Sequence, residues 1–133
     1  MPSIQQRVMH YAHELYNNVI VFPTKPAGER WKECLEQAWE LHYLRYLLAH
    51  GVVEFTYLKR DGTMRTARGT NYLDIIPPSK QPNGHQQLMI DAGMEQPNYK
   101  SIAYYDLDKE DWRAFKVINF VQINRMTAIT PIE

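Results

Sequence analysis

The spacing of apolar residues changes at Gly51: before it they recur every three to four positions, and after it they alternate. The chain opens with Ser3-Ile4-Gln5-Gln6, which is typical of a helix-capping box, because the Ser3 hydroxyl can bond the Gln6 amide while the Gln6 side chain reaches back. The apolar residues that follow at helical spacing are Ile4, Val8, Tyr11, Ala12 and Leu15. We therefore expect a first helix that ends near Asn17-Asn18.

A second helix is predicted from about Glu29 to Ala49, and Gly51 stands just past its end, where a left-handed cap belongs. It carries two stripes of apolar or aromatic residues. One stripe is Trp31, Cys34, Leu35, Ala38, Leu41 and Leu48. The other is Trp39, Tyr43, Tyr46 and His50.

The two stripes lie on opposite faces of this helix, because Leu41 and Tyr43 are two residues apart, which is about 200° of rotation. A surface helix needs only one apolar face. Two interpretations of the second stripe stay open: it packs on the first helix or the barrel, or it forms a subunit contact or ligand wall. In the second case Trp39, Tyr43 and Tyr46 are the interface residues.

From Val52 onward the pattern predicts strands. Val53, Phe55 and Tyr57 alternate with less apolar neighbours, Asp61-Gly62 is a strong hairpin signal, and residues 63–70 form the return strand. Gly69 inside that strand predicts a bulge or a sharp bend. Further strands are expected at residues 101–106, 112–117 and 119–126.

Residues 71–100 between these strands form an irregular segment. It holds four of the eight prolines, and at about 30 residues it is too long for an ordinary connection, so it is either a functional loop or a disordered one. The predicted fold is α+β, with two N-terminal helices packed on a small five-stranded antiparallel SH3/Sm-like β-barrel. The helical segment 1–51 and the barrel 52–133 should form one compact domain.

Composition narrows the function classes. The 133 residues are 44% hydrophobic, and 15 Lys and Arg balance 15 Asp and Glu, which removes the simplest argument for a nucleic-acid binder, a strongly basic chain. Cys34 is the only cysteine, so neither an intramolecular disulfide nor a multi-cysteine zinc site can form. There is no secretory signal and no apolar run of the roughly 18 residues that a membrane helix needs, so we expect a cytoplasmic protein without membrane contact.

Three segments carry a resemblance to a known family. They are GVVEFTY with KRDGTMRTARGT at 51–57 and 59–70, YYDLDKEDWRAFKV at 104–117, and WKECLEQAW at 31–39. Together they resemble a WYL-like family with an Sm-like SH3 β-barrel fold, which occurs in bacterial mobile elements and phages. The resemblance implies a role in ligand sensing or nucleic-acid-linked regulation, often beside a DNA-binding domain.

The predicted barrel interleaves cationic and aromatic side chains. Arginine can hold a phosphate bidentately, and an aromatic ring can stack on a base. The expected ligand-binding residues are Arg65, Arg68, Tyr104, Arg113 and Lys116. Because residues three apart on a strand face opposite ways, a single site would take Arg68 with Arg113, or Arg65 with Lys116. The alternative is that these are solvated positions paired with the acidic residues of the segment 106–111.

An enzyme is the least supported class, because the sequence has no nucleophile elbow, phosphate loop or dinucleotide fingerprint, and no carboxylate pair spaced for acid–base work. We expect no metal site and no cofactor. The favoured function is a non-enzymatic regulatory binding module that takes nucleic acid or a nucleotide-like anion through the barrel. The alternatives are an oligomeric assembly or protein-interaction module using the aromatic helix face, and an oligomeric nucleotide-sequestering counter-defence protein.

Overall fold

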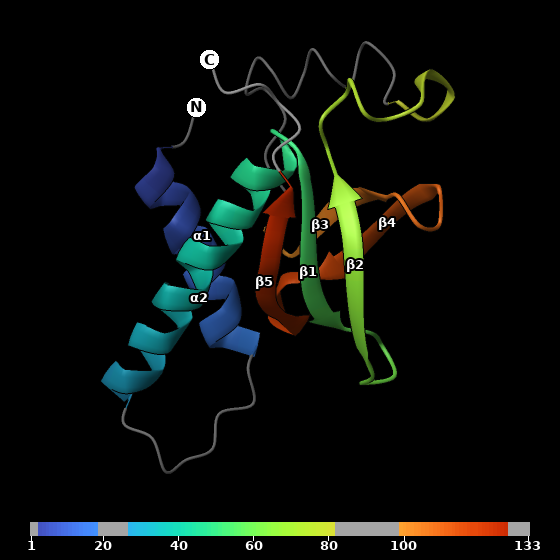
Figure 1. Ribbon diagram of the computed structural model, residues 1–133. Coiled ribbons are helices and arrows are strands. Elements are labelled where there is room, and N and C mark those ends of the chain that lie inside the picture. Colours follow the sequence, from blue (N-terminus) through green and yellow to red (C-terminus); the bar gives the residue numbers. More distant parts are fainter. Residues whose placement is uncertain (1–2, 19–26, 82–98, 128–133) are drawn as a thin grey trace.

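The computed structural model describes residues 3–18, 27–81 and 99–127 (Figure 1). Two helices precede five strands, with two short 3₁₀ turns between strands. The elements are α1 Ile4–Asn18, α2 Ala27–Leu48, β1 Val52–Leu58, β2 Met64–Thr70, η1 Pro78–Lys80, β3 Ser101–Asp106, β4 Asp111–Lys116, η2 Val117–Asn119 and β5 Phe120–Thr127. The predicted α+β class is confirmed, and each expected helix and strand is present.

Helix α1 begins with the capping box that the sequence predicts. The Ser3 amide donates to Oε1 of Gln6 at 2.8 Å, and the Gln6 amide donates to Oγ of Ser3 at 3.1 Å. The buried residues of α1 are Val8, Tyr11, Ala12 and Leu15, as the periodicity indicates, whereas Ile4 is exposed. This apolar stripe packs α1 against α2.

Helix α2 ends differently from our expectation. Among the described glycines, positive φ occurs at Gly62, so Gly51 is not a left-handed cap. The carbonyl of Leu48, the last residue of α2, instead accepts a hydrogen bond from the Asn71 amide at 2.8 Å, and the Thr70 hydroxyl donates to the carbonyl of Gly51 at 2.7 Å. Because residues at and just past the end of β2 supply these donors, the helix end needs no glycine conformation of its own.

The five strands form one antiparallel sheet in the order β4-β3-β2-β1-β5. Strands β2 and β3 pair only through Gly69 with Asp106 and Thr70 with Tyr105, and Figure 1 shows β3 and β4 running across the direction of β1 and β2. Among the described strands, β4 and β5 do not pair with each other. The expected SH3/Sm-like arrangement is therefore a strongly bent open sheet and not a closed barrel.

No bulge lies at Gly69. The pairing of β1 with β2 is continuous from Val53 opposite Gly69 to Leu58 opposite Met64. The register shifts fall instead between β1 and β5, at Glu54/Phe55 and at Thr56/Tyr57. The irregularities of the strand pairing thus lie on the opposite side of β1 from Gly69, where the predicted bulge is absent.

The main core fills the space between the helices and the concave face of the sheet. Its aromatic part includes Phe55, Tyr57, Tyr104 and Phe115; the rings of Tyr57 and Phe115 stack with centroids 4.8 Å apart, and Phe55 meets Tyr104 edge-on at 5.0 Å. These contacts join β1, β3 and β4 although few backbone bonds link β2 to β3. Side-chain packing therefore holds the bent sheet together.

A second, smaller packed layer lies on the outer face of β3 and β4. Residues 71–81 cross this face, where Ile76 and Tyr105 are buried and Trp112 meets Tyr105 edge-on. The indole Nε1 of Trp112 donates to the carbonyl of Lys80, and the Asn71 side chain donates to that of Ala103 at 3.0 Å. The beginning of the irregular segment is thus part of the folded domain, while residues 82–98 lie outside the described residues.

Candidate functional site

The strand register separates the predicted ligand-binding residues into two groups. Arg65 stands opposite Tyr57 on the core-facing side of the sheet, and Arg113 stands opposite Tyr104 on that same side. Arg68 and Lys116 occupy the other face, because each is an odd number of residues away from these positions along its strand. The expected pairs, Arg68 with Arg113 and Arg65 with Lys116, are therefore not brought together.

Arg65 and Tyr104 belong to a polar network inside the fold. Nη2 of Arg65 donates to Oδ2 of Asp106 in an ion pair, and Asp106 is fully buried. The hydroxyls of Tyr104 and Tyr57 are 2.7 Å apart. Burial, together with the hydrogen bond to Tyr57, raises the pKa of Tyr104 above its usual range. Nη2 of Arg65 and the hydroxyl of Tyr104 are thus both directed to internal partners.

Asp106 also organises the turn between β3 and β4. Its Oδ1 accepts hydrogen bonds from the backbone amides of Asp108 and Lys109, at 3.0 and 3.1 Å. The sequence contains a signal for this role that we missed: Ile102, Tyr104 and Asp106 alternate on β3, which places the carboxylate on the core face with the two apolar residues. A carboxylate in that position needs an internal cation and amide donors, and it has both.

The remaining cations are exposed. Arg68 is paired with Asp108, the two side chains being 52% and 58% exposed and 3.5 Å apart. This is the solvated acid–base pairing that the sequence left open as an alternative. Arg113 and Lys116 are also exposed, on opposite faces of β4. No two of these cations converge within the described part of the chain as a phosphate site would require.

The outer face of β5, β1 and β2 is polar and internally bonded. The Thr56 hydroxyl lies 3.1 Å from that of Thr66 and donates to Oδ1 of Asn124 at 3.2 Å. Beside them Nε of Arg125 donates to Oε2 of Glu54 at 3.2 Å. This face therefore carries both signs of charge in balance.

The predicted interface residues are all on the surface. Trp39, Tyr43 and Tyr46, which we call the aromatic face, are 47%, 54% and 56% exposed. On the opposite side of the same helix Ala38, Leu41 and Leu44 are completely buried. The three side chains are therefore not part of the buried core, and their expected contact with a subunit or ligand stays a prediction.

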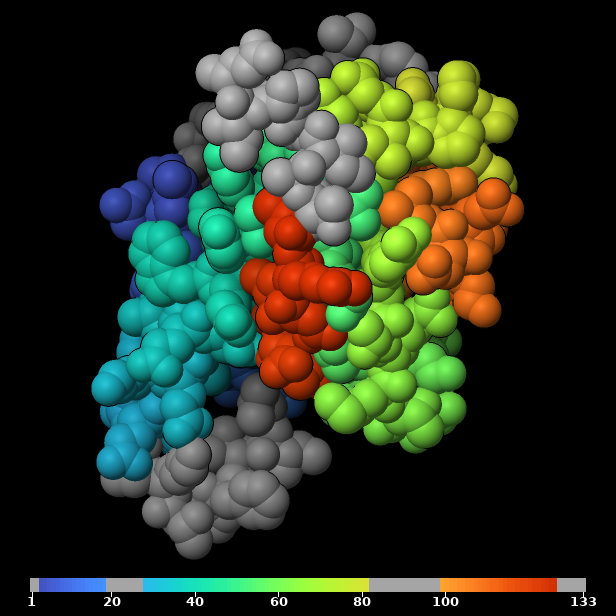
Figure 2. All heavy atoms as spheres, viewed as in Figure 1, coloured from blue at the N-terminus to red at the C-terminus, as the bar shows by residue number. Residues whose placement is uncertain are grey.

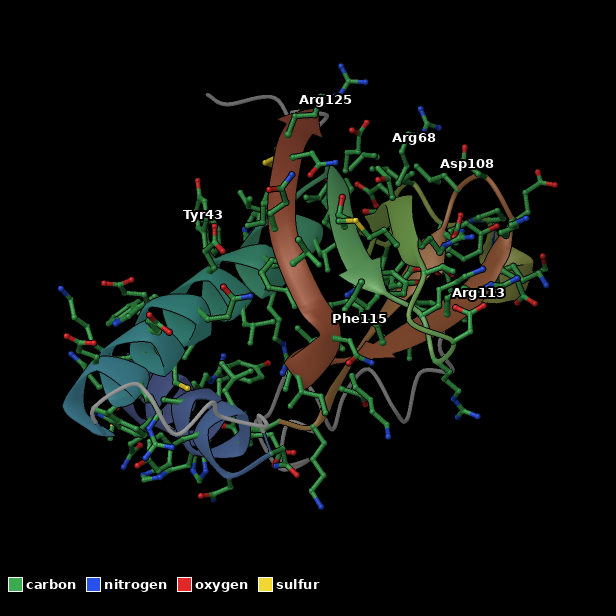
Figure 3. All side chains as sticks on the ribbon, turned by 90° about the horizontal axis from the view of Figure 1, so that it is seen from below. Tyr43, Arg68, Asp108, Arg113, Phe115 and Arg125 are labelled. Carbon is green, nitrogen blue, oxygen red and sulfur yellow. The ribbon has the colours of Figure 1, made fainter. Side chains whose placement is uncertain are left out.

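The aromatic face adjoins the polar face of the sheet. Figure 2 shows α2 and β5 side by side on one continuous surface of the molecule. In Figure 3, Tyr43, Arg68 and Arg125 extend to the same side of the ribbon, whereas Phe115 lies within it. Aromatic rings and charged side chains from three different elements thus share one side of the domain.

Comparison with protein families gives one match. The model of the family described as WYL_2, Sm-like SH3 beta-barrel fold, matches residues 41–121, which is 81 of the 133 residues. The chain belongs to the WYL_2 family. The match runs from the second half of α2 into β5, so it confirms the resemblance in the strands and includes Tyr43 and Tyr46. No curated protein and no solved structure matches this WYL_2 chain.

The described residues of this WYL_2 domain give little support to a metal site, a reactive cysteine or a membrane-spanning helix. Among the described residues, no group of three or more His, Cys, Asp or Glu side chains could hold a metal ion. Cys34 is partly buried on α2, and burial raises the pKa of its thiol, which disfavours the reactive thiolate. No helix in the described ranges is long and apolar enough to cross a membrane.

Proposed function

We propose that this WYL_2 protein is a non-enzymatic binding module that works by docking another protein on the aromatic face of α2. The observation that supports the proposal is the contrast between the two sides of one helix. On one side Ala38, Leu41 and Leu44 are completely buried, while the other side presents three large aromatic rings, each about half exposed. Aromatic side chains are the residues most enriched at protein interfaces, where they bring much contact area at little cost in side-chain entropy.

Binding of nucleic acid or a nucleotide-like anion through the barrel stays a prediction with weaker support. The charge of Arg65 is compensated by Asp106 and that of Arg68 by Asp108, while Arg113 and Lys116 face opposite ways. Affinity for a nucleic-acid backbone comes from several uncompensated cations acting together. Sequestration of a nucleotide would depend on the same cations and shares this weakness.

Photo-crosslinking in cells tests the proposal and captures whichever protein occupies the aromatic face. A benzophenone amino acid replaces Tyr43 in the full chain, and the cells are irradiated. We expect a crosslinked adduct that disappears when Tyr46→Glu is added on the same face. The control places the benzophenone at Met64, which is 64% exposed on β2, away from α2. Equal adducts at both positions, or none at position 43, would overturn the proposal.

A further inference from the structure

We infer that the partner of the aromatic face is α2 of a second copy of this chain, lying antiparallel across a two-fold axis near Tyr43 and Tyr46. The inference rests on the proposed function and names its partner. The exposed side of α2 carries a helix-pairing seam, its charges select one orientation, and the surrounding surface is electrically balanced.

The exposed residues of α2 are spaced as a helix–helix seam requires. Steps of three and four alternate along one stripe, which continues past the helix into the next turn: Glu29, Lys32, Glu36, Trp39, Tyr43, Tyr46 and His50. This heptad spacing keeps one side of a helix against another helix. The aromatic residues occupy the C-terminal part of the seam and charged residues the N-terminal part. A second α2 offers the same apolar segment, and self-complementary two-fold contacts are the commonest form of assembly.

The charges select the antiparallel orientation. Four exposed glutamates of α2 precede Tyr43, against one exposed lysine, Lys32: they are Glu29, Glu33, Glu36 and Glu40. A parallel pair in register would place Glu29 and Glu36, which lie on the seam, beside their own copies, and like charges in juxtaposition are unfavourable. An antiparallel pair centred between Tyr43 and Tyr46 separates them, because each charged segment then extends past the C-terminal end of the partner helix.

In this antiparallel dimer, the glutamates of one copy lie near Arg125 of the other copy. Its side chain is 75% exposed, and Figure 3 shows it on the same side as Tyr43, toward the C-terminal end of α2. A two-fold rotation about the aromatic face moves the N-terminal half of one α2 toward Arg125 of the second copy. Arg125 already contacts Glu54 through Nε, but its guanidinium has further donors to offer a carboxylate.

The charge of the whole molecule does not oppose this contact. The formal net charge of the chain is zero, so no long-range repulsion separates two copies. The aromatic segment from Trp39 to Tyr46 is only about 10 Å long at the usual helical rise. A stable interface covers about 800 Å² on each partner, so the contact should extend from α2 onto the neighbouring outer face of β5.

Two measurements on the purified full chain test the inference. Sedimentation velocity should show a mass that rises from monomer to dimer with concentration. Tyr43→Glu should abolish the rise, while the control Met64→Glu, which adds the same charge at an exposed position of β2, should retain it. Circular dichroism checks that both variants fold.

Pulsed electron paramagnetic resonance then measures the distance between two spin labels, which gives the relative orientation of the two α2 helices. A spin label is attached at Lys32→Cys in a Cys34→Ser background. Across an antiparallel pair centred between residues 43 and 46, the two labelled positions are separated by about 38 Å along the helix axes at 1.5 Å per residue. In a parallel pair they are only about 10 Å apart, the usual distance between packed helices.

The outcomes separate the inference from the proposed function. A dimer with a short label distance overturns the antiparallel orientation. A dimer that survives Tyr43→Glu overturns the interface. A monomer at every concentration, together with adducts at Tyr43 in cells, overturns the second copy as partner but leaves the proposed function standing. A monomer at every concentration with no adduct at Tyr43 in cells overturns both the inference and the proposed function.

Discussion

The ring of Tyr104 lies directly against Gly69, so that a β-carbon built on Gly69 would be 2.5 Å from Cδ2 of Tyr104. The ring has little freedom to move away, because its hydroxyl is bonded to that of Tyr57 and its edge packs on Phe55. Gly69 also lies at the corner of the sheet, where it pairs with Val53 on one side and Asp106 on the other. The missing side chain is therefore what allows β3 to cross β2 at this point.

Gly69→Ala should destabilise the fold, because the added methyl group cannot fit without moving a ring fixed at both ends. Overpacking of this kind costs about 1–3 kcal/mol of unfolding free energy. Urea denaturation followed by tryptophan fluorescence measures the change. Gly28→Ala is the matched control: nothing lies within 4 Å of its added carbon, and alanine is favoured in a helix. A Gly69→Ala protein as stable as the Gly28→Ala protein would contradict this account.

Asp106→Asn should cost about 3–5 kcal/mol of unfolding free energy, the range for breaking a buried ion pair by removing one partner. The substitution leaves the Arg65 guanidinium without its carboxylate in a largely buried position. Asp108→Asn, which interrupts the exposed pair with Arg68, should cost less than about 1 kcal/mol. Urea denaturation of the two variants under the same conditions compares the losses. Similar losses of unfolding free energy would show that the buried ion pair of Asp106 contributes no more to stability than the exposed pair of Asp108.

Stability should fall as the pH decreases below about 6.5, the ordinary histidine value. Burial, and then the nearby charges of Arg7 and Arg45, lower the pKa of His42 in the folded state. The unfolded chain therefore binds a proton at His42 before the folded chain does, and protonation favours unfolding. The free energy of unfolding at pH 7.5 and pH 5.5 should differ less in His42→Gln than in the parent chain. An unchanged difference would rule out a contribution from His42.

Trp112→Ala should loosen residues 71–81 from the sheet while the main core stays intact. The indole holds this segment through its bond to the Lys80 carbonyl and its contact with Tyr105. Limited trypsin digestion should then cleave after Lys80 faster than in the parent chain, with little change in the urea denaturation of the helices followed by circular dichroism. Trp39→Ala, at an exposed position of α2, serves as the control and should leave the cleavage rate unchanged.

Local patterns were sufficient for the secondary structure of this chain. The Ser3 capping box and the Asp61-Gly62 turn depend on contacts between residues close in sequence, so they could be predicted without the fold. The end of α2 could not, because the carbonyl of its last residue, Leu48, is satisfied by the amide of Asn71, which lies far along the chain. The sequence could not decide between a bulge and a sharp bend at Gly69 for a similar reason: its neighbour Tyr104 is distant in sequence.

The sequence by itself determined the number, type and approximate limits of the helices and strands, the alternation of faces along each strand, and the presence of a second stripe on α2. Only the tertiary structure decided which of these faces would be used. It placed Arg65 against a buried Asp106, put Arg68 and Arg113 on opposite sides of the sheet, and left Tyr43 uncovered. The reason is that periodicity specifies which side chains share a face, whereas burial and pairing depend on the elements that pack against it.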